Sequence, residues 1–360
     1  MPELNVDPRI EHASTLPSAF YKDPAWFERS KDAIFAKSWQ WIGHLDQAKV
    51  AGAVHPFTLL EGCLDEPLLL TRDTDDHMHL LSNVCTHRGM TVCEGAGNER
   101  FLRCRYHGRR YGLDGCFQHM PEFTDVVGFP TPADSLTKIP MGNWGPLLFA
   151  SLSPNQGMEE WFRPMLERLD WLPLNEFRFA QEGTRDYLVK SNWALYVDNY
   201  LEGFHIPFIH ASLNATIDYE TYAYELFDTG NLQLAEAKSG EDCFDLPESS
   251  PDYGRRIAAY YYWFFPNLMF NFYPWGLSIN VVKPLGPDVT RVSFVRYIWQ
   301  EDRLGQGAGA QLDRVEREDE QVVELVQKGV QSRFYDRGRF SPKREAGTHQ
   351  FHVLVSKFLA

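Results

Sequence analysis

The sequence lacks any long apolar run and any cluster of basic residues. Residues 260–275 form the most apolar stretch, which is too short to span a bilayer and is interrupted by Pro266, Asn267, Asn271 and Pro274. The formal net charge is −14, and no Lys/Arg-rich segment offsets it. This acidity argues against a groove for nucleic-acid phosphates, favours solubility, and suits a cationic substrate or a basic redox partner. We therefore expect a protein that binds neither a membrane nor nucleic acid.

The sequence also lacks a recognisable targeting segment and is poor in cysteine. Residues 1–14 are polar and acidic, with neither the basic start nor the apolar centre of a signal peptide, so we predict a cytoplasmic protein. Six cysteines in 360 residues do not suggest a disulfide framework in such a protein. Two of them, Cys85 and Cys104, lie near histidines, which points to a metal site instead.

The chain shows no internal repeat and no low-complexity segment, and its size allows one large core or two moderate ones. From about residue 41 to residue 152, short β-rich runs alternate with turns that contain Gly, Asn and Asp. These runs cover residues 54–60, 67–72, 78–84 and 147–152. We predict a small all-β module here, followed by a link over residues 153–157.

The rest of the chain mixes helix and strand patterns. Asp23 and Pro24 start a predicted helix that reaches residue 37, as its N-cap and its first helical residue. Further helices are predicted over residues 193–205 and 312–329, and strands over residues 178–188, 260–272, 277–283 and 290–299. This pattern favours an α+β fold, with an antiparallel sheet and helices packed on one side. If the first helix packs with this sheet, the β module is an insertion in the second domain.

Two short segments each pair one cysteine with one histidine. The pairs Cys85-x-His87 and Cys104-x-x-His107 are separated by sixteen residues. Together they offer the two thiolates and two imidazoles of a Rieske [2Fe–2S] cluster, in which the cysteines bind one iron and the histidines the other. A structural zinc site uses the same residue types, but zinc fingers favour a cysteine pair followed by a histidine pair. The spacing therefore favours the cluster, and a glycine shortly after each histidine suits a tight covering loop.

A second set of histidines and acids follows in the region predicted to be α+β. Glu202 and His205 are three residues apart, so on a helix they share one face with Asp198. Pro207 is predicted to end that helix, which allows the chain to turn and bring His210 back towards His205. Two histidines and one carboxylate on one face of a metal ion are typical of non-haem Fe(II) oxygenases.

The carboxylate ligand is expected from elsewhere in the chain. The predicted helix over residues 312–329 carries four acids in one short run, Glu316, Glu318, Asp319 and Glu320. Geometry does not choose among them, and a solvated acidic face is the plain alternative for the run as a whole.

The motifs resemble those of the Rieske non-haem iron oxygenases, the ring-hydroxylating family. The segments C-T-H-R-G and C-R-Y-H-G around the two Cys/His pairs resemble the Rieske motif, and Met90 stands where respiratory Rieske proteins carry an additional cysteine. The resemblance covers nearly the whole chain. It implies an all-β Rieske domain over residues 40–155, and a catalytic domain over residues 1–39 and 156–360 whose antiparallel sheet is flanked by helices. It also implies one [2Fe–2S] cluster and one mononuclear Fe(II) per chain, with O₂ as co-substrate.

The same resemblance implies roles for individual residues. It assigns the cluster to Cys85, His87, Cys104 and His107, and the mononuclear iron to His205, His210 and Asp319. Glu202 stands where the family keeps a carboxylate between the two metal centres, so we expect it to couple them across a subunit boundary. Asp198 and Asn199 match an acidic residue and an asparagine of the family's catalytic centre, and we expect them to support the ligands from behind.

The later half of the chain resembles the branch of choline monooxygenase and the glycine betaine and carnitine oxygenases. A glutamate at position 202, where aspartate is commonest in the family, belongs to this likeness. Plant choline monooxygenase has one more residue between this acid and the first iron histidine, so its substrate is not transferred to this chain. The aromatic residues between positions 260 and 275 are dense enough to form a cation–π cage for a quaternary ammonium group, although alternate residues of these strands must also face a core.

We therefore expect the terminal oxygenase of a multicomponent oxidoreductase, which hydroxylates or N-dealkylates a quaternary ammonium compound. The alternatives are an aromatic-ring dioxygenase that forms a cis-dihydrodiol and a ferredoxin-like electron carrier, which would need only the first motif. The sequence has no GxGxxG fingerprint and no recognisable flavin site, so the electrons are expected from a separate NAD(P)H-dependent reductase, directly or through a ferredoxin. The resemblance also implies a homotrimer.

Overall fold

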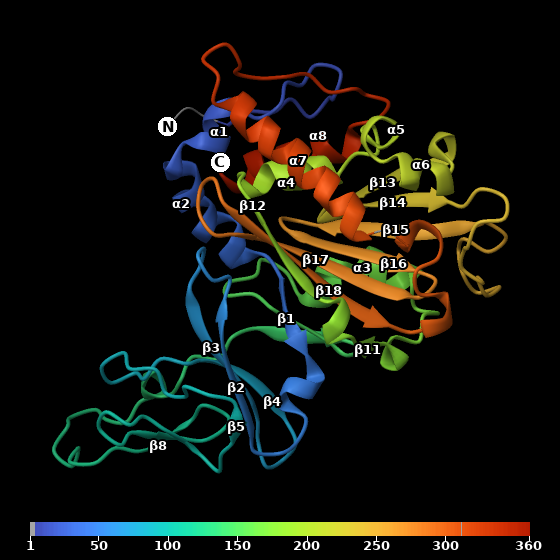
Figure 1. Cartoon of the computed structure of the whole chain (residues 1–360). Helices are drawn as coiled ribbons and strands as arrows, with labels where there is room; N and C mark the ends of the chain where they lie inside the picture. Colours follow the sequence, from blue (N-terminus) through green and yellow to red (C-terminus); the bar gives the residue numbers. More distant parts are fainter. Residues whose placement is uncertain (1–3, 311) are drawn as a thin grey trace. The chain divides into compact units, whose positions relative to one another are not determined.

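The computed structural model describes residues 4–310 and 312–360, which form two compact units (Figure 1). One unit is Ala36–Met158, and the other joins the chain up to Phe35 with Glu159–Ala360. The smaller unit is therefore an insertion in the sequence of the larger one. No helix in the described part of the chain is long and apolar enough to cross a membrane.

The smaller unit, all of whose residues are described, is built from short antiparallel strands. Its four-stranded sheet has the order β4 (Met78–Ser82), β3 (Glu66–Arg72), β2 (Ala53–Leu59) and β5 (Gly97–Asn98). Its two three-stranded sheets are β1 (Gln40–His44), β10 (Leu147–Ala150) and β9 (Met141–Trp144), and β6 (Leu102–Arg103), β7 (Arg110–Tyr111) and β8 (Phe117–His119). The all-β character expected from the sequence is thus confirmed, because each apolar run is short and ends at a turn.

Within the described residues, the larger unit contains one eight-stranded antiparallel sheet. Its hydrogen-bonded neighbours follow the order β11-β18-β17-β16-β15-β14-β13, and β12 also pairs with β18. The strands are β11 (Arg178–Phe179), β12 (Arg185–Val189), β13 (Ala223–Phe227), β14 (Gly230–Glu236), β15 (Ile257–Phe264), β16 (Leu268–Tyr273), β17 (Gly276–Pro284) and β18 (Thr290–Ile298). The most apolar stretch of the sequence forms the β15–β16 hairpin in the middle of this sheet, where it is buried on both faces.

Helices cover both faces of this sheet (Figure 1). They are α3 (Met158–Arg168), α4 (Trp193–Tyr200), α7 (Leu312–Val330) and α8 (Ala346–Phe358). Phe351 of α8 packs on Trp263 with ring centroids 5.5 Å apart, whereas Phe162 of α3 lies 4.7 Å from Phe264. Trp263 and Phe264 are adjacent on β15 and point to opposite faces. The predicted packing of helices on one side was therefore wrong, since α3 covers the second face.

The segment that carries the predicted histidines is more broken than expected. Instead of one helix over residues 193–205, α4 ends at Tyr200, and two short helices follow, α5 (Ile206–Ile209) and α6 (Ala211–Thr216). Pro207 does not end a helix. It lies in the first turn of α5, where its missing N–H removes no helical hydrogen bond. Glu202 and His205 therefore stand in the link between α4 and α5 rather than on one helical face.

The predictions for other elements were only partly correct. The helix expected to reach residue 37 ends as α2 (Pro24–Ala33), capped by Asp23 as predicted, and residues 178–188 form two short strands separated by a turn. Helix α8 was missed. Its side chains are buried on most sides, so it lacks the alternation of apolar and polar residues that reveals a surface helix.

Candidate functional site

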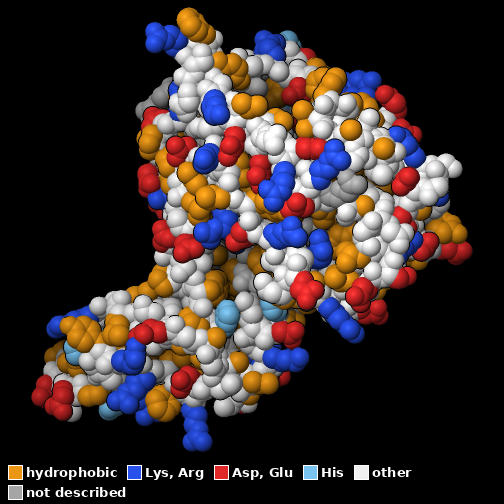
Figure 2. All heavy atoms as spheres, viewed as in Figure 1, with side chains coloured by type: hydrophobic (Ala, Val, Ile, Leu, Met, Phe, Trp, Pro, Cys, Tyr) orange, Lys and Arg blue, Asp and Glu red, His pale blue; other side chains and the backbone are white. Residues whose placement is uncertain are grey.

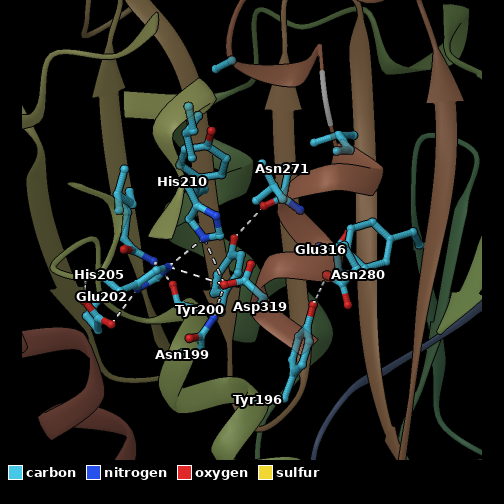
Figure 3. Close-up of a pocket in the computed structure, with 18 of the residues that line it drawn as sticks. Tyr196, Asn199, Tyr200, Glu202, His205, His210, Asn271, Asn280, Glu316 and Asp319 are labelled. Atoms are coloured by element: carbon cyan, nitrogen blue, oxygen red, sulfur yellow. Dashed lines mark hydrogen bonds and ion pairs between the residues drawn. The ribbon is translucent and has the colours of Figure 1, made fainter. Parts of the chain in front are cut away.

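Three predicted metal ligands come together in the larger unit (Figure 3). His205 lies just before α5, His210 lies between α5 and α6, and Asp319 lies on α7. The Nε2 atoms of His205 and His210 are 3.1 Å apart. Asp319 Oδ1 is 3.0 Å from Nε2 of His210 and 3.5 Å from Nε2 of His205. The structure therefore brings together groups that are separated by about a hundred residues in the sequence.

The hydrogen bonds behind the histidines indicate which nitrogen of each ring is free for a metal. Nδ1 of His205 lies 2.7 Å from Oε1 of Glu202, and Nδ1 of His210 lies 2.8 Å from Oε2 of Glu318. A carboxylate accepts a hydrogen bond, so each Nδ1 carries the proton and each Nε2 presents its lone pair to the shared centre. Two such lone pairs beside the Asp319 carboxylate form a donor set that fits a divalent cation such as Fe(II).

The structure distinguishes the four acids of α7 that the sequence left as candidates for the carboxylate ligand. Asp319 faces both histidines, and Glu318 lies behind His210. Glu316 is 2% exposed and belongs to the wall of the adjoining pocket. No contact between Glu320 and either histidine is found in the described residues. The sequence identified Glu318 only as a rival ligand, whereas in the structure it orients His210.

The neighbouring Asp198 and Asn199 side chains point in different directions. Asn199 Nδ2 donates a hydrogen bond to Asp319 Oδ1 at 2.6 Å, as a residue that supports a ligand should. The Asp198 carboxylate instead meets Nε2 of His352 at 2.7 Å and accepts a hydrogen bond from the Tyr21 hydroxyl at 3.0 Å. Asp198 therefore ties α4 to the N-terminal segment and to α8, and its contacts are with these elements rather than with the histidine pair.

A pocket adjoins the His205, His210 and Asp319 group (Figure 3). Its described lining is rich in aromatic rings and amides: Tyr196, Tyr200, Tyr222, Tyr261, Tyr273, Phe294, Gln233, Asn271 and Asn280. Tyr261 and Tyr273 belong to the aromatic stretch noted in the sequence, whereas Tyr260 and Tyr262 point to the other face because side chains alternate along β15. The described lining includes no lysine and no arginine.

Sequence reasoning missed part of this lining. Tyr196 and Tyr200 are four residues apart on α4, and Tyr200 donates to Asn271 Oδ1 at 2.7 Å. Their helical spacing, just before the predicted ligand segment, is a signal that could have identified them. Tyr222 and Gln233 come from separate elements and are joined by a hydrogen bond of 3.1 Å, which only the fold reveals.

The electrostatics of the pocket are dominated by negative groups. Burial raises the pKa of Glu316 well above its ordinary value, and the nearby charge of Asp319 adds to this effect. Burial lowers the pKa of His210, but hydrogen bonding to Asp319 and the charges of Asp319 and Glu318 more than offset it, so the pKa is raised. Neighbouring acids contribute to both shifts, and an excess of acid favours bound cations.

The smaller unit forms the second group of predicted ligands from two matching loops. Gly89 N–H donates to Cys85 O, and Gly108 N–H donates to Cys104 O, each at 3.0 Å. Both glycines have φ near +75°, with values of 71° and 78°, in the left-handed region that other residues rarely adopt. The two Cys/His segments are therefore folded back in the same way, although they share only short motifs.

The four side chains carried by these loops suit a Rieske cluster. Nδ1 of His87 lies 3.2 Å from Nδ1 of His107, so the two rings present the same nitrogen to one another. Cys85 and Cys104 are 3% and 2% exposed and lie in the core of the unit. Two buried sulfurs together with two partly exposed imidazoles are the donors that such a cluster requires.

Tyr111 tunes one of the sulfurs. Its hydroxyl donates to Cys85 Sγ at 3.2 Å. Burial raises the pKa of Cys85, but hydrogen bonds from Tyr111 and from the His87 backbone outweigh it and lower the pKa. Burial and the bond to Cys85 in turn raise the pKa of Tyr111 to about 12. The tyrosine therefore remains a hydrogen-bond donor that stabilises a thiolate, and sequence reasoning did not identify it.

Comparison with known families divides the chain in the same order. Residues 38–130 match the Rieske [2Fe-2S] domain, and residues 176–360 match the ring hydroxylating alpha subunit (catalytic domain). The chloroplastic choline monooxygenase of Arabidopsis thaliana is 31% identical over 97% of this chain and 84% of its own length. The carnitine monooxygenase oxygenase subunit of Escherichia coli K12 is 28% identical over 96% of this chain and 94% of its own length.

Solved structures share the fold over the full length of the chain. The quaternary ammonium Rieske monooxygenase CntA, in complex with an inhibitor, superposes with a TM-score of 0.79, 24% identity and complete coverage of both chains. A naphthalene 1,2-dioxygenase with indole bound superposes with a TM-score of 0.75 and 17% identity, over 100% of this chain and 95% of its own. Because both structures match, the fold by itself does not distinguish between substrates.

Proposed function

Because the chain belongs to the Rieske non-haem iron oxygenases, the ring-hydroxylating alpha-subunit family, we propose that it is an oxygenase that hydroxylates quaternary ammonium compounds. The observation that carries this proposal is the pocket beside His205, His210 and Asp319, whose described lining combines aromatic rings with a buried acid and contains no lysine and no arginine. The relatives named choline and carnitine monooxygenase agree with this substrate class.

The residues that would hold the cofactors follow from the donor geometry. We assign the cluster to Cys85, His87, Cys104 and His107, and the mononuclear iron to His205, His210 and Asp319. When bound, the cluster supplies single electrons and the Fe(II) centre activates O₂. The domain limits around residues 39 and 156 belong to the same proposal, and so does a cytoplasmic location.

Substrate recognition in this proposal relies on attraction between a cation and π faces. Tyr200, Tyr222, Tyr261 and Tyr273 surround the pocket, and a quaternary ammonium group near such rings gains about 0.5–2 kcal/mol from each favourable contact. Glu316 adds a buried carboxyl group, whose Oε1 has no hydrogen-bond partner among the described residues. A methyl group on nitrogen would then point towards His205, His210 and Asp319, where the iron would be bound. This placement suits hydroxylation of an N–CH₃ or N–CH₂ carbon.

The overall reaction inserts one oxygen atom into a C–H bond, while the other leaves as water at the expense of two electrons and two protons. If the hydroxylated carbon is attached to nitrogen, the product breaks down to an aldehyde and an amine. The electrons are proposed to come from a separate NAD(P)H-dependent reductase, directly or through a ferredoxin. We also propose a homotrimer, in which Glu202 would contact a cluster histidine of a neighbouring subunit while holding His205.

Glu202 should be a positioning residue that is needed for electron transfer rather than for iron retention. Its Oε1 holds Nδ1 of His205 at 2.7 Å, and its Oε2 accepts the His205 backbone N–H at 3.0 Å. We expect Glu202→Gln to keep both cofactors but to slow turnover by roughly 10–100-fold. The measurement is the iron content together with the rate at which the reduced cluster is reoxidised in a single turnover with substrate and O₂.

Glu318→Gln provides the matched control, because Glu318 makes the equivalent contact to Nδ1 of His210 at 2.8 Å. We expect this variant to hold iron more weakly but to reoxidise its cluster at a normal rate per bound iron. Loss of iron from the Glu202 variant, or equal effects of the two substitutions on reoxidation, would exclude a coupling role for Glu202.

The test of the proposed function is product identification with the pre-reduced, iron-replete protein in O₂. The panel contains choline, glycine betaine and longer betaines, the uncharged carbon isostere 3,3-dimethylbutan-1-ol, and aromatic acids and hydrocarbons. We expect formaldehyde or an amino-aldehyde from an ammonium compound, and at least roughly 10-fold lower turnover of the uncharged isostere. A cis-diol or hydroxylated ring from an aromatic compound would instead establish the runner-up function, an aromatic-ring oxygenase.

A further inference from the structure

A second cavity in the larger unit adjoins the pocket described above. The two cavities share Phe294 and Leu312 as lining residues. The second one is basic: its described lining contains Arg185, Arg296 and Arg314 but one acid, Asp313. Figure 2 shows basic side chains gathered on the visible face where β18 and the beginning of α7 lie, with acidic side chains among them. A negative, aromatic pocket thus stands next to a positive one.

Strand pairing places Arg296 on the face of the sheet that lines the aromatic pocket beside His205, His210 and Asp319. Tyr261 pairs with Asn271, Asn271 pairs with Ser278, and Ser278 pairs with Arg296. Directly paired residues point to the same face, so a row of polar side chains runs from the pocket to Arg296. Neighbouring strands are about 4.8 Å apart, so the backbone of Arg296 lies about 10 Å from that of Asn271.

Arg296 differs from the other two arginines of this cavity because no ion pair is found for it in the described residues. Arg185 binds Asp313 at 2.9 Å, and Arg314 binds Glu318 at 3.0 Å. The guanidinium of Arg296 lies 5.6 Å from the centre of the Trp275 ring and is only partly exposed. A half-buried cation without an acidic partner is costly, so the site favours an anion.

The guanidinium of Arg296 lies close to the backbone of Gly183 and to the ring of Trp275. Burial lowers the pKa of Arg296, and the charge of Arg185 lowers it further, yet arginine remains charged at neutral pH. A Cβ atom built on Gly183 would stand 2.6 Å from Cζ of Arg296, so a larger residue at position 183 would push this side chain aside. The side chain is thus packed between Gly183 and Trp275 rather than extended into solvent.

We propose that Arg296 binds the carboxylate of a zwitterionic substrate whose quaternary ammonium end occupies the aromatic pocket. The planar guanidinium suits the two oxygens of a carboxylate. Because the backbones of Arg296 and Asn271 are about 10 Å apart, the site favours a betaine with several carbons between its charges over glycine betaine. This inference rests on the proposed function for the cationic end, and it adds the anionic end and the residue that selects it.

The experiment compares γ-butyrobetaine with its methyl ester, which has the same carbon chain and cation but lacks the anion and carries one additional methyl group. Binding is measured by calorimetry on the full-length iron-replete protein, and kcat and KM are measured in O₂ with an external electron donor in excess. We expect the wild-type protein to bind the acid roughly 10–100-fold more tightly than the ester. Arg296→Gln should remove this preference through KM while leaving kcat and the cluster spectrum unchanged. Arg296→Lys should restore part of it.

Two further variants test whether the effect is specific to the position of the Arg296 guanidinium or comes from a general change in folding. Gly183→Ala keeps every charge but should displace the guanidinium, so it should weaken binding of the acid and not of the ester. Arg185→Gln is the matched control: this arginine lines the same cavity but is 57% exposed and already paired with Asp313. We expect it to change the preference by less than about 2-fold.

The outcomes separate this inference from the proposed function. Equal binding of acid and ester by the wild-type protein, or an equal loss of both in Arg296→Gln, would overturn the role of Arg296 even if ammonium compounds are oxidised. If the acid binds through Arg296 but no ammonium compound is oxidised, the proposed reaction fails while the anion site stands.

Discussion

Asp319→Asn should reduce turnover by at least roughly 1,000-fold while leaving the visible spectrum of the [2Fe–2S] cluster intact. Asp319 Oδ1 lies 3.0 Å and 3.5 Å from the Nε2 atoms of the two histidines, so it is the only charged group facing both within the described residues. An amide oxygen is a weaker donor for Fe(II) than a carboxylate and carries no charge to offset that of the ion. The measurement is the iron content per chain, together with product formation and the absorbance spectrum.

Glu320→Gln is the matched control for this substitution, because it removes the same charge one residue further along α7. No contact joins Glu320 to His205 or His210 in the described residues, so we expect its iron content to match that of the wild type. An Asp319→Asn protein that retained mononuclear iron and turned over at a normal rate would mean that another acid of α7 binds the ion. Glu318 would then be the first to test, since it already contacts His210.

Cys104→Ser should remove the cluster and with it all turnover that depends on an external electron donor. Cys104 is 2% exposed and belongs to the core around Cys85, Tyr111 and Leu81. A serine hydroxyl cannot replace the thiolate and would leave a polar group buried in that core. We expect a colourless protein that has lost the iron of the cluster but keeps the mononuclear site, and whose smaller unit unfolds at a lower temperature.

Cys93→Ser shows whether this loss is specific. Cys93 is only partly buried, packs against the same core and lies outside the two Cys/His loops. Its replacement should preserve the brown colour, the iron content and turnover. A Cys104→Ser protein with a normal cluster spectrum would contradict the assignment of the ligands, and a colourless Cys93→Ser protein would show that any change in this core expels the cluster.

The sequence predicted most about the site where ligands are close together along the chain. A cysteine and a histidine within one short loop are held at nearly fixed distances by the backbone, so Cys85/His87 and Cys104/His107 could be read as two halves of one site. The pair His205 and His210 was predictable for the same reason, even though the helix expected to carry it is broken after Tyr200.

Tertiary structure was needed where the partners are far apart in sequence or differ only in direction. The four acids on α7 are of similar type and lie close together in the sequence. Only their contacts in the folded chain show that Asp319 faces both histidines, whereas Glu318 lies behind His210 and Glu316 contacts Tyr196. Adjacent residues such as Asp198 and Asn199 diverge by about 100° on a helix, so one reaches α8 and the other reaches Asp319.

By itself, the sequence determined the two kinds of metal-binding motif, the all-β character of the inserted unit and the α+β character of the rest, because each depends on local spacing and periodicity. Only the tertiary structure decided which aromatic residues face the pocket, that Tyr111 contacts Cys85, and that Arg296 lies beside the pocket with no acidic partner among the described residues. These features depend on strand register and side-chain direction, which bring together residues far apart in the chain and leave no pattern along it.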